Sequence, residues 1–305
     1  MGKPPSTMRL FAFPLTSPRN IATKNYGNRH PLIYYYAQMP KTKRDEREPS
    51  LLKRAQDKAS QMWVNWGKEP GGWKLKVHTY GEKVVDKVDF EELALASIDT
   101  SLGPRLPQLT ARDSTGKELS ERQSKTHTIS IPLIYPPSCI SSANPLDNLQ
   151  QLLAHRSPLH RRRTWFWVGV MPFTAPFALL PIVPNLPFFF CVWRAWTHWK
   201  AHKASAYLLE LVEQGAIRAM PSQELDKIYS NTAKLLSGPT RNDTKRHERT
   251  KFDSNVQVVQ LFPNPTMTIP QIIDTYSLPK EAERSFLRAV EQARIRSEME
   301  PTGKS

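Results

Sequence analysis

Residues 164–193 read TWFWVGVMPFTAPFALLPIVPNLPFFFCVW, and this stretch decides the fold class. Its 30 residues include five prolines and no charged side chain. The hydrocarbon core of a bilayer is about 30 Å thick and takes about 20 apolar residues in a helix. A soluble surface helix is apolar on one face only. The sequence therefore predicts that this stretch enters a membrane.

Basic and aromatic residues lie on both sides of the apolar stretch. Positive side chains stay on the side of a membrane that is not translocated, and tryptophan is enriched at the interface. Because both flanks are basic, both ends are predicted to lie on the same side, as in a helical hairpin. Anionic lipid headgroups are the expected partners of these flanks. The predicted interface anchors are Arg161, Arg162, Arg163, Trp165, Arg194, Trp196, His198 and Lys200.

The hairpin is predicted to turn between Leu180 and Leu186, where prolines crowd together. Proline inside a helix removes a hydrogen bond and clashes with the preceding turn. Two alternatives remain open. One is a single tilted, kinked span, and the other is a soluble buried hairpin. In the hairpin, Pro172 and Pro176 would kink the first arm. The predicted turn residues are Pro181, Pro184, Asn185 and Pro187.

The rest of the chain is polar and basic. The whole chain of 305 residues carries a net charge of +15, and its mean hydropathy is -0.52. This composition predicts a membrane-anchored soluble protein rather than a polytopic carrier. Cys139 and Cys191 form neither a disulfide framework nor a metal motif. No nucleophile–base set or phosphate loop stands out in the sequence, so neither an enzyme, a cofactor nor a metal is expected.

The N-terminal region combines basic residues with predicted strands. Residues 1–44 contain eight Lys or Arg and no Asp or Glu. An acid-poor basic N-terminus is typical of a mitochondrial transit peptide, but an ordinary basic region of strands and loops fits as well. Strands are predicted at 8–15, 32–37 and 126–135 from their composition and alternation. Pro132 would place the third strand at a sheet edge.

Helical periodicity predicts several helices outside the apolar stretch. Two lie at 51–66 and after Gly72, with a shared aromatic core of Trp63, Trp66, Trp73 and Tyr80. Asp89 and Glu92 resemble the capping box of a short third helix. Further helices are predicted from Pro145 into the arginine cluster, along the second arm to Gly215, and at 222–229, 269–276 and 280–299.

The predicted fold class is a mostly α membrane protein. It has an apolar, Pro-rich helical hairpin or one kinked span, a small α+β N-terminal soluble region and an α-helical C-terminal tail. The predicted segments are a basic N-terminus with strands (1–50), a soluble α+β region (51–135), a helix with a basic flank (136–163), the membrane hairpin (164–199), a helical extension (200–235), a disordered linker (236–255) and a helical tail (256–305).

His198 and His202 lie four residues apart, so they share one face of a helix. Such a pair could bind a metal ion or respond to pH. The sequence shows no third ligand beside them. The alternative interpretation is that both histidines lie near lipid headgroups.

Three segments together resemble the mitochondrial K⁺–H⁺ exchange-related family. They are MRLFAFPLTS at 8–17, GGWKLKVHTYGEKVVDKVDFEELALASID at 71–99 and WVGVMPFTAPFALLPIVPNLPFFFCVWRAW at 167–196. The resemblance covers about 8–215. One departure is PRNIATKNYGNRHP at 18–31, which separates the first two strands where the family pattern runs almost directly from one to the other.

The resemblance implies a protein of the inner mitochondrial membrane that is linked to potassium–proton exchange. Because both basic flanks are expected on the side that is not translocated, most of the chain is predicted to face the matrix. A site that exchanges these cations usually contains a carboxylate within the membrane. Residues 164–193 contain no ionisable side chain, so an accessory or regulatory role is predicted. Two alternatives are the exchanger or channel itself, as an oligomer, and a matrix scaffold facing the ribosome or other assembly machinery.

The expected partners follow from this prediction. They are the lipid bilayer and either other inner-membrane proteins or a second copy of the chain. Potassium and protons would be involved indirectly. No nucleic acid is expected, because lipid headgroups account for the basic flanks.

Overall fold

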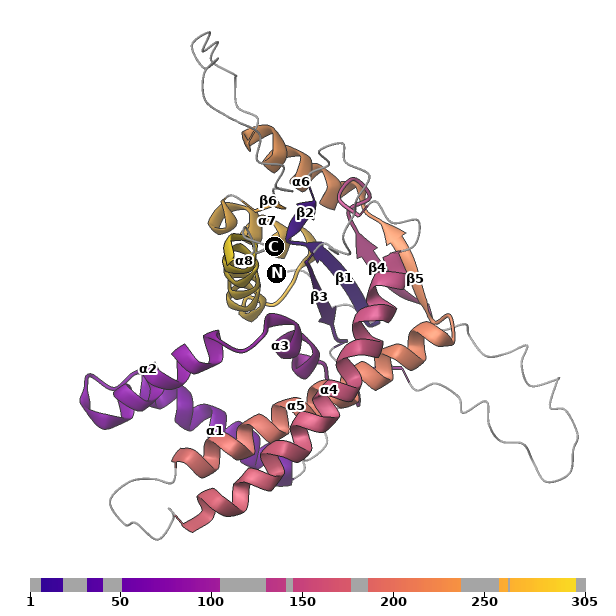
Figure 1. The fold of residues 1–305 in the computed structure, drawn as a ribbon. Helices are drawn as coiled ribbons and strands as arrows, with labels where there is room; N and C mark the ends of the chain where they lie inside the picture. The colour runs from indigo at the N-terminus through magenta and orange to yellow at the C-terminus, as the bar shows by residue number, and fades with distance from the viewer. Residues whose placement is uncertain are drawn as a thin grey trace, which may run out of the picture.

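A computed structural model describes residues 7–18, 32–40, 51–104, 130–140, 145–176, 186–236, 258–262 and 264–299. These residues form a mostly helical structure around a small mixed sheet (Figure 1). The predicted combination of helices with a small α+β region is thereby confirmed. The predicted turn residues Pro181, Pro184 and Asn185 and nearly all of the predicted linker 236–255 lie outside the described residues.

The four-stranded sheet has the order β3-β1-β4-β5. β1 (Arg9–Pro14) pairs antiparallel with β3 (Ile33–Gln38) and parallel with β4 (Ile131–Tyr135). β4 also pairs in parallel with β5 (Ile217–Pro221). The three predicted strands are confirmed, whereas β5 was not predicted. Only Ile217 of β5 is buried, so its sequence carries no alternation of apolar and polar residues.

The prediction that Pro132 marks a sheet edge is wrong, because β4 lies between β1 and β5. The N–H of Ile131 donates to Ala216 on the β5 side, so position 132 faces β1. The pairing of β4 with β1 begins only at Leu133. Pro132, which has no N–H, therefore lies just before the residues of β4 that pair with β1, and the sheet loses no hydrogen bond there.

β1 is buried on both faces and divides the core in two. Phe11 and Phe13 pack with helices from the end of the chain, whereas Leu10 and Ala12 pack against the hairpin helices. Successive side chains of a strand point to opposite faces, so one short apolar strand contributes to both cores. The molecule consequently has helices on both sides of a central sheet (Figure 1).

The C-terminal part of the chain covers the first of these faces. α6 (Gln223–Leu236), α7 (Pro265–Tyr276) and α8 (Glu281–Met299) supply its helices, and β6 (Val258–Gln260) pairs antiparallel with β2 (Thr16–Pro18). The predicted tail helices are confirmed, and α6 is longer than predicted. The apolar face of α8 docks through side chains that include the buried Ala282, Phe286 and Val290.

Two long helices form the opposite side. α4 (Pro145–Thr174) and α5 (Leu186–Glu213) lie side by side and project away from the sheet (Figure 1). They are antiparallel, because Ser157 contacts His202 while Trp167 contacts Phe190. The segments on either side of the prolines are therefore paired as a hairpin. Among the described helices, none combines the length and hydropathy needed to cross a membrane.

The predicted end of the second arm near Gly215 is confirmed. The N–H of Gly215 donates to Val212 and the N–H of Ala216 donates to Leu211, which together close the last turn. Gly215 has a φ of 67°, a left-handed conformation that glycine adopts at little cost. The chain then enters β5 directly, so the hairpin is joined firmly to the sheet.

The predicted aromatic core of α1 (Leu51–Gly67) and α2 (Gly72–Asp86) is only partly right. The ring of Trp66 contacts that of Trp63 on the same helix and that of Trp73 on α2. However, Trp73 is 51% exposed and Tyr80 is 71% exposed. Two helices that pack mainly on each other leave their outer faces open, so these rings are not enclosed.

α3 (Phe90–Ser97) begins where it was predicted, but one capping residue has another role. The carboxylate of Asp89 accepts the Glu91 N–H, as expected of an N-cap. The capping-box prediction for Glu92 is wrong, since this side chain turns instead toward Arg194 on α5. Burial against α5 makes the guanidinium a stronger partner than a backbone N–H at the helix start.

Candidate functional site at the base of the hairpin

Four polar side chains meet where α3 packs on the hairpin, and we call them the Glu–Arg–His cluster. They are Glu92 on α3, His160 on α4, and Arg194 and His198 on α5. Glu92, His160 and His198 are 2%, 1% and 0% exposed. Burial of several ionisable groups is costly unless they pair with one another, so their contacts determine which charges the site can hold.

The helices explain this convergence. Arg194 and His198 are four residues apart on α5 and therefore point the same way. The antiparallel pairing of the hairpin places His160 opposite His198. Glu92 lies in the first turn of α3, which crosses α5 at this level. Three separate segments thus bring their polar side chains to one buried point.

Arg194 binds two members of the cluster. Its Nη1 donates to Glu92 Oε1 at 2.7 Å, and its Nη2 lies 3.4 Å from Glu92 Oε2. Nη2 also lies 2.9 Å from Nε2 of His198. Nδ1 of His198 lies 3.2 Å from Nδ1 of His160 and 3.5 Å from Glu92 Oε1. The four side chains therefore form one connected network.

The network fixes the hydrogens on both imidazoles. A guanidinium only donates hydrogen bonds, so Nε2 of His198 must accept and its hydrogen must sit on Nδ1. That N–H then donates to Nδ1 of His160, whose own hydrogen must sit on Nε2. Within the described residues Nε2 of His160 is buried without a hydrogen-bond partner. Both rings are consequently neutral.

The electrostatic surroundings agree with neutral rings. Burial, followed by the positive charge of Arg194, lowers the pKa of His198 to about 3. Burial, with Arg156 and Arg163 adding to it, lowers the pKa of His160 to about 4. Burial also raises the pKa of the Glu92 carboxyl, although Arg194 acts in the opposite direction. The site thus holds a carboxylate and two uncharged nitrogen bases.

A second ionic group continues from α3 toward the other helices. Arg156 on α4 binds Asp89 at 3.1 Å and also binds Glu91, and Arg296 on α8 binds Asp89 at 3.1 Å. Each acidic side chain at the start of α3 therefore has an arginine partner from α4, α5 or α8. α3 links the hairpin electrostatically to the C-terminal helices.

The structure separates the predicted interface anchors into two kinds. Arg161, Arg162, Arg163 and Trp165 are exposed or partly exposed on α4, with Trp165 70% exposed, and Trp196 and Lys200 are partly exposed on α5. His198 lies inside the protein instead of at an interface, and Arg194 pairs with Glu92 instead of extending outward. Pro187 is the second residue of α5. The predicted anchors therefore form two groups. Arg161, Arg162 and Arg163 face solvent, whereas Arg194 and His198 lie largely inside the protein.

The predicted histidine pair does not form. His202 bonds to Ser157, with its Nδ1 3.1 Å from both the hydroxyl and the carbonyl oxygen. His198 meets His160 and Glu92 instead, and neither of these was singled out as a ligand from the sequence. The only feature of the sequence that pointed to His160 was its place among the basic residues that precede the apolar stretch. Glu92 is distant in the chain and resembled a helix cap.

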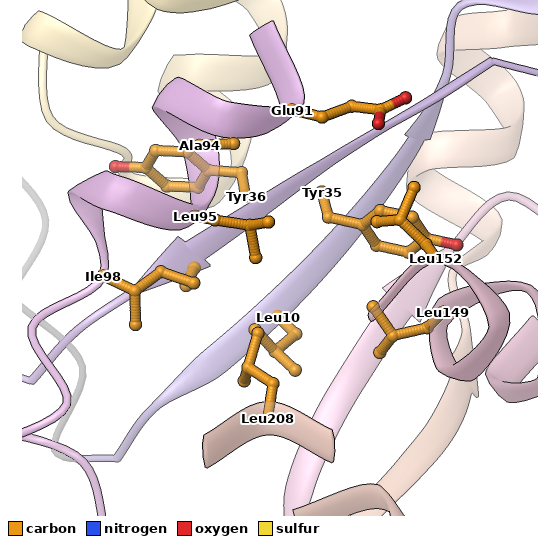
Figure 2. A pocket seen from close by; sticks show the side chains of 11 residues that line it. Leu10, Tyr35, Tyr36, Glu91, Ala94, Leu95, Ile98, Leu149, Leu152 and Leu208 are labelled. Atoms are coloured by element: carbon orange, nitrogen blue, oxygen red, sulfur yellow. The ribbon is translucent and has the colours of Figure 1, made fainter. Parts of the chain in front are cut away.

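A small apolar cavity lies between α3, the sheet and the hairpin (Figure 2). Leu10, Leu95, Leu149 and Leu208 are among its lining residues, and Glu91 lies at its margin. Its volume of about 20 Å³ has room for about one water molecule. The cavity is therefore too small to bind an organic substrate.

The far part of the hairpin has an apolar surface. Trp165 and Phe173 on α4 are 70% and 79% exposed, and Phe166 and Phe189 are each 61% exposed. We call residues 164–174 and 186–193 the hairpin tip. Large exposed apolar areas mark a surface that contacts a membrane or another protein.

Comparisons with known proteins agree with the resemblance noted in the sequence. A family model described as mitochondrial K⁺–H⁺ exchange-related matches residues 9–212. An uncharacterized protein of Saccharomyces cerevisiae is 22% identical over 163 residues, which are 52% of this chain and 51% of that protein. An uncharacterized protein of Schizosaccharomyces pombe is 24% identical over 170 residues, which are 55% of this chain and 65% of that protein. No solved structure matches the chain.

Proposed function

This chain belongs to the mitochondrial K⁺–H⁺ exchange-related family, and we propose that it is an accessory or regulatory component of potassium–proton exchange. It acts at the inner mitochondrial membrane, with most of the chain on the matrix side, and it is not an enzyme. Its role is to attach to the bilayer and to other inner-membrane proteins or a second copy of itself.

The exposed aromatic side chains of the hairpin tip carry this proposal. Burial of Trp165, Phe173 and Phe189 in lipid would remove their large apolar surfaces from water. Arg161, Arg162 and Arg163 directly precede the tip, where they can meet anionic headgroups. The tip enters the bilayer while the cluster at its base stays in the protein.

The chemistry of the hairpin supports an accessory role over transport by the chain alone. Residues 164–193 contain no ionisable side chain that could bind a potassium ion and a proton in turn. The Glu92 carboxylate at the base already has the cation of Arg194 bound at 2.7 Å. A potassium ion, which needs several oxygen ligands, would have to displace that guanidinium.

One observation favours a second candidate, the exchanger itself as an oligomer. Glu92 is a buried carboxylate whose pKa is raised, and such a group can take up and release a proton. An oligomer could surround a path that leads to it. A matrix scaffold without any part in ion movement is the third class of function.

Potassium acetate swelling distinguishes these functions. Mitochondria that lack the protein should swell more slowly, since electroneutral exchange is required for swelling, and re-expression should restore the rate. Purified protein alone in liposomes should exchange no potassium for protons. Robust exchange by the protein alone would favour the oligomeric exchanger, and normal swelling without the protein would favour the scaffold.

Membrane attachment has a separate test. The protein should stay in the membrane pellet after carbonate extraction, and it should sediment with vesicles that contain an anionic phospholipid. The double change Trp165→Asp and Phe173→Asp should reduce vesicle binding at least tenfold. Met267→Asp is the matched control, because Met267 is 77% exposed on α7, away from the tip. Equal loss in both variants, or full release by carbonate, would contradict membrane attachment.

A further inference from the structure

We propose that Glu92, His160 and His198 bind a divalent transition-metal ion, for which Zn²⁺ is the best chemical match. Each of the three buried side chains offers one ligand atom, and these atoms all lie within 4.8 Å of one another. Imidazole nitrogens with a carboxylate oxygen are a common zinc ligand set. The fourth position would be filled by water.

The distances between the ligand atoms already resemble those around a metal. Two ligands at about 2.0–2.1 Å from a tetrahedral Zn²⁺ are about 3.3 Å from each other. Nδ1 of His160 and Nδ1 of His198 are 3.2 Å apart, and Nδ1 of His198 is 3.5 Å from Glu92 Oε1. Two of the three distances between ligand atoms are therefore close to those around Zn²⁺. Rotation of the Glu92 side chain would shorten the third, between Glu92 and His160.

His160 is prepared to coordinate through Nδ1. Its Nδ1 carries a lone pair and its hydrogen is on Nε2, as the hydrogen bonds at the site require. A metal-bound imidazole has the same arrangement, with the hydrogen on the nitrogen that does not ligate. The buried Nε2 without a partner among the described residues is compatible with this state, and His160 needs no change of tautomer.

His198 must change, and that change involves Arg194. When Nδ1 of His198 binds a metal, its hydrogen moves to Nε2, which can then no longer accept from Arg194. The guanidinium and the metal also compete for the Glu92 carboxylate. Arg194 already lies over the ring of Trp193, with 5.5 Å between Cζ and the ring centroid, so a place for the displaced side chain is at hand. Arg194 therefore acts as the competitor of the metal.

Metal binding can be measured on the purified full chain after treatment with a chelator. Calorimetric titration with Zn²⁺ should give one site per chain, and Co²⁺ should give the visible absorption of a tetrahedral site with nitrogen ligands. His160→Ala, His198→Ala and Glu92→Gln should each weaken Zn²⁺ binding about 100-fold or more, since even outer partners of a ligand contribute up to about 100-fold. Mg²⁺, which prefers oxygen ligands, should not compete.

Two further variants make the test specific. His155→Ala removes an exposed histidine from α4, the same helix as His160, and should bind Zn²⁺ like the unchanged protein. Arg194→Met removes the competing cation and should bind Zn²⁺ at least tenfold more tightly. Zn²⁺ should also raise the melting temperature of Arg194→Met more than that of the unchanged protein, because the ion replaces the lost partner of Glu92.

The possible results distinguish the metal site from binding elsewhere and from the competition by Arg194. Equal Zn²⁺ affinity in the unchanged protein, His160→Ala and His198→Ala would overturn the site. An affinity lost equally in His155→Ala would show binding elsewhere and would overturn it too. If the ligand variants lose Zn²⁺ but Arg194→Met does not gain affinity, the competition by Arg194 is wrong. Melting temperatures without metal identify any variant that is unfolded, and for these His160→Gln and His198→Gln replace the alanine changes.

Discussion

The guanidinium of Arg194 on α5 holds the carboxylate of Glu92 on α3, with Nη1 2.7 Å from Oε1. Their side chains are only 13% and 2% exposed. The pair joins a short helix from the first third of the chain to the helical hairpin that follows it. The same carboxylate also faces His198, so this ion pair both fixes the packing of α3 and controls the chemistry of the buried cluster.

Removing one partner of this pair should lower the stability of the fold strongly, whereas removing both charges together should lower it much less. Arg194→Met or Glu92→Gln alone should lower the free energy of unfolding by about 3–5 kcal/mol, because each leaves a buried charge or donor without its partner. The double variant should lose clearly less than the sum of the two. Urea unfolding of the metal-free protein measures all three. Additive losses would mean that the two side chains do not interact.

Asp89 should make the protein sensitive to acid. Burial acts to raise the pKa of this carboxyl, but Arg156, Arg296 and the Glu91 N–H outweigh it, and the pKa is lowered below its ordinary value of 3.8. A lowered pKa in the folded state adds stability that is complete above the unfolded pKa and is lost as pH falls through the folded one. Asp89→Asn should therefore flatten the loss of stability below about pH 4.

Urea unfolding at several pH values between 6 and 2.5 measures how steeply the free energy of unfolding falls with pH. Arg156→Met serves as the matched variant, since removing the arginine should return the Asp89 pKa toward its ordinary value and flatten the same acid limb. An unchanged slope in both variants would show that Asp89 does not control the acid response.

The pairing of α1 with α2 depends on a glycine. A Cβ added at Gly81 would lie 2.3 Å from the Trp63 ring, closer than any real contact. Alanine is usually favoured over glycine in a helix by about 1 kcal/mol, but here Trp63 would have to move and lose its bond to Glu82. Gly81→Ala should therefore lower hydrogen-exchange protection in both helices. Gly169→Ala, inside α4 and with nothing within 4 Å of the added Cβ, should leave the protection of both helices unchanged.

Phe286 tests whether the C-terminal helix belongs to the core. Its ring is 1% exposed and contacts Phe13, Tyr34 and Phe262 at centroid distances of 4.8, 5.3 and 5.4 Å. Phe286→Ala should lower the free energy of unfolding by about 3–5 kcal/mol in a urea titration. A loss below about 1 kcal/mol, equal to that of Met267→Ala at an exposed position, would show that α8 is dispensable.

Elements with a regular apolar period could be predicted from the sequence, and those without one could not. β1 and β3 carry dense aromatic and apolar residues, and α8 carries a narrow apolar face, so each was identified at nearly its true position. β5 exposes four of its five residues and is a strand only because β4 offers it backbone partners. Pro132 misled for the same reason, since its position in the sheet depends on its neighbours.

Residue pattern by itself determined the helices, the apolar hairpin with its basic flanks, and the family. These are local properties, because side-chain spacing, proline positions and charge act within a few residues of one another. Only the tertiary structure decided that Glu92, His160 and Arg194 meet on His198. Glu92 and Arg194 are 102 residues apart in the chain, and His160 and His198 are 38 residues apart. Burial then changes their chemistry: in the low dielectric between α3, α4 and α5, a predicted helix cap becomes a paired carboxylate and two histidines of the basic flanks become neutral bases.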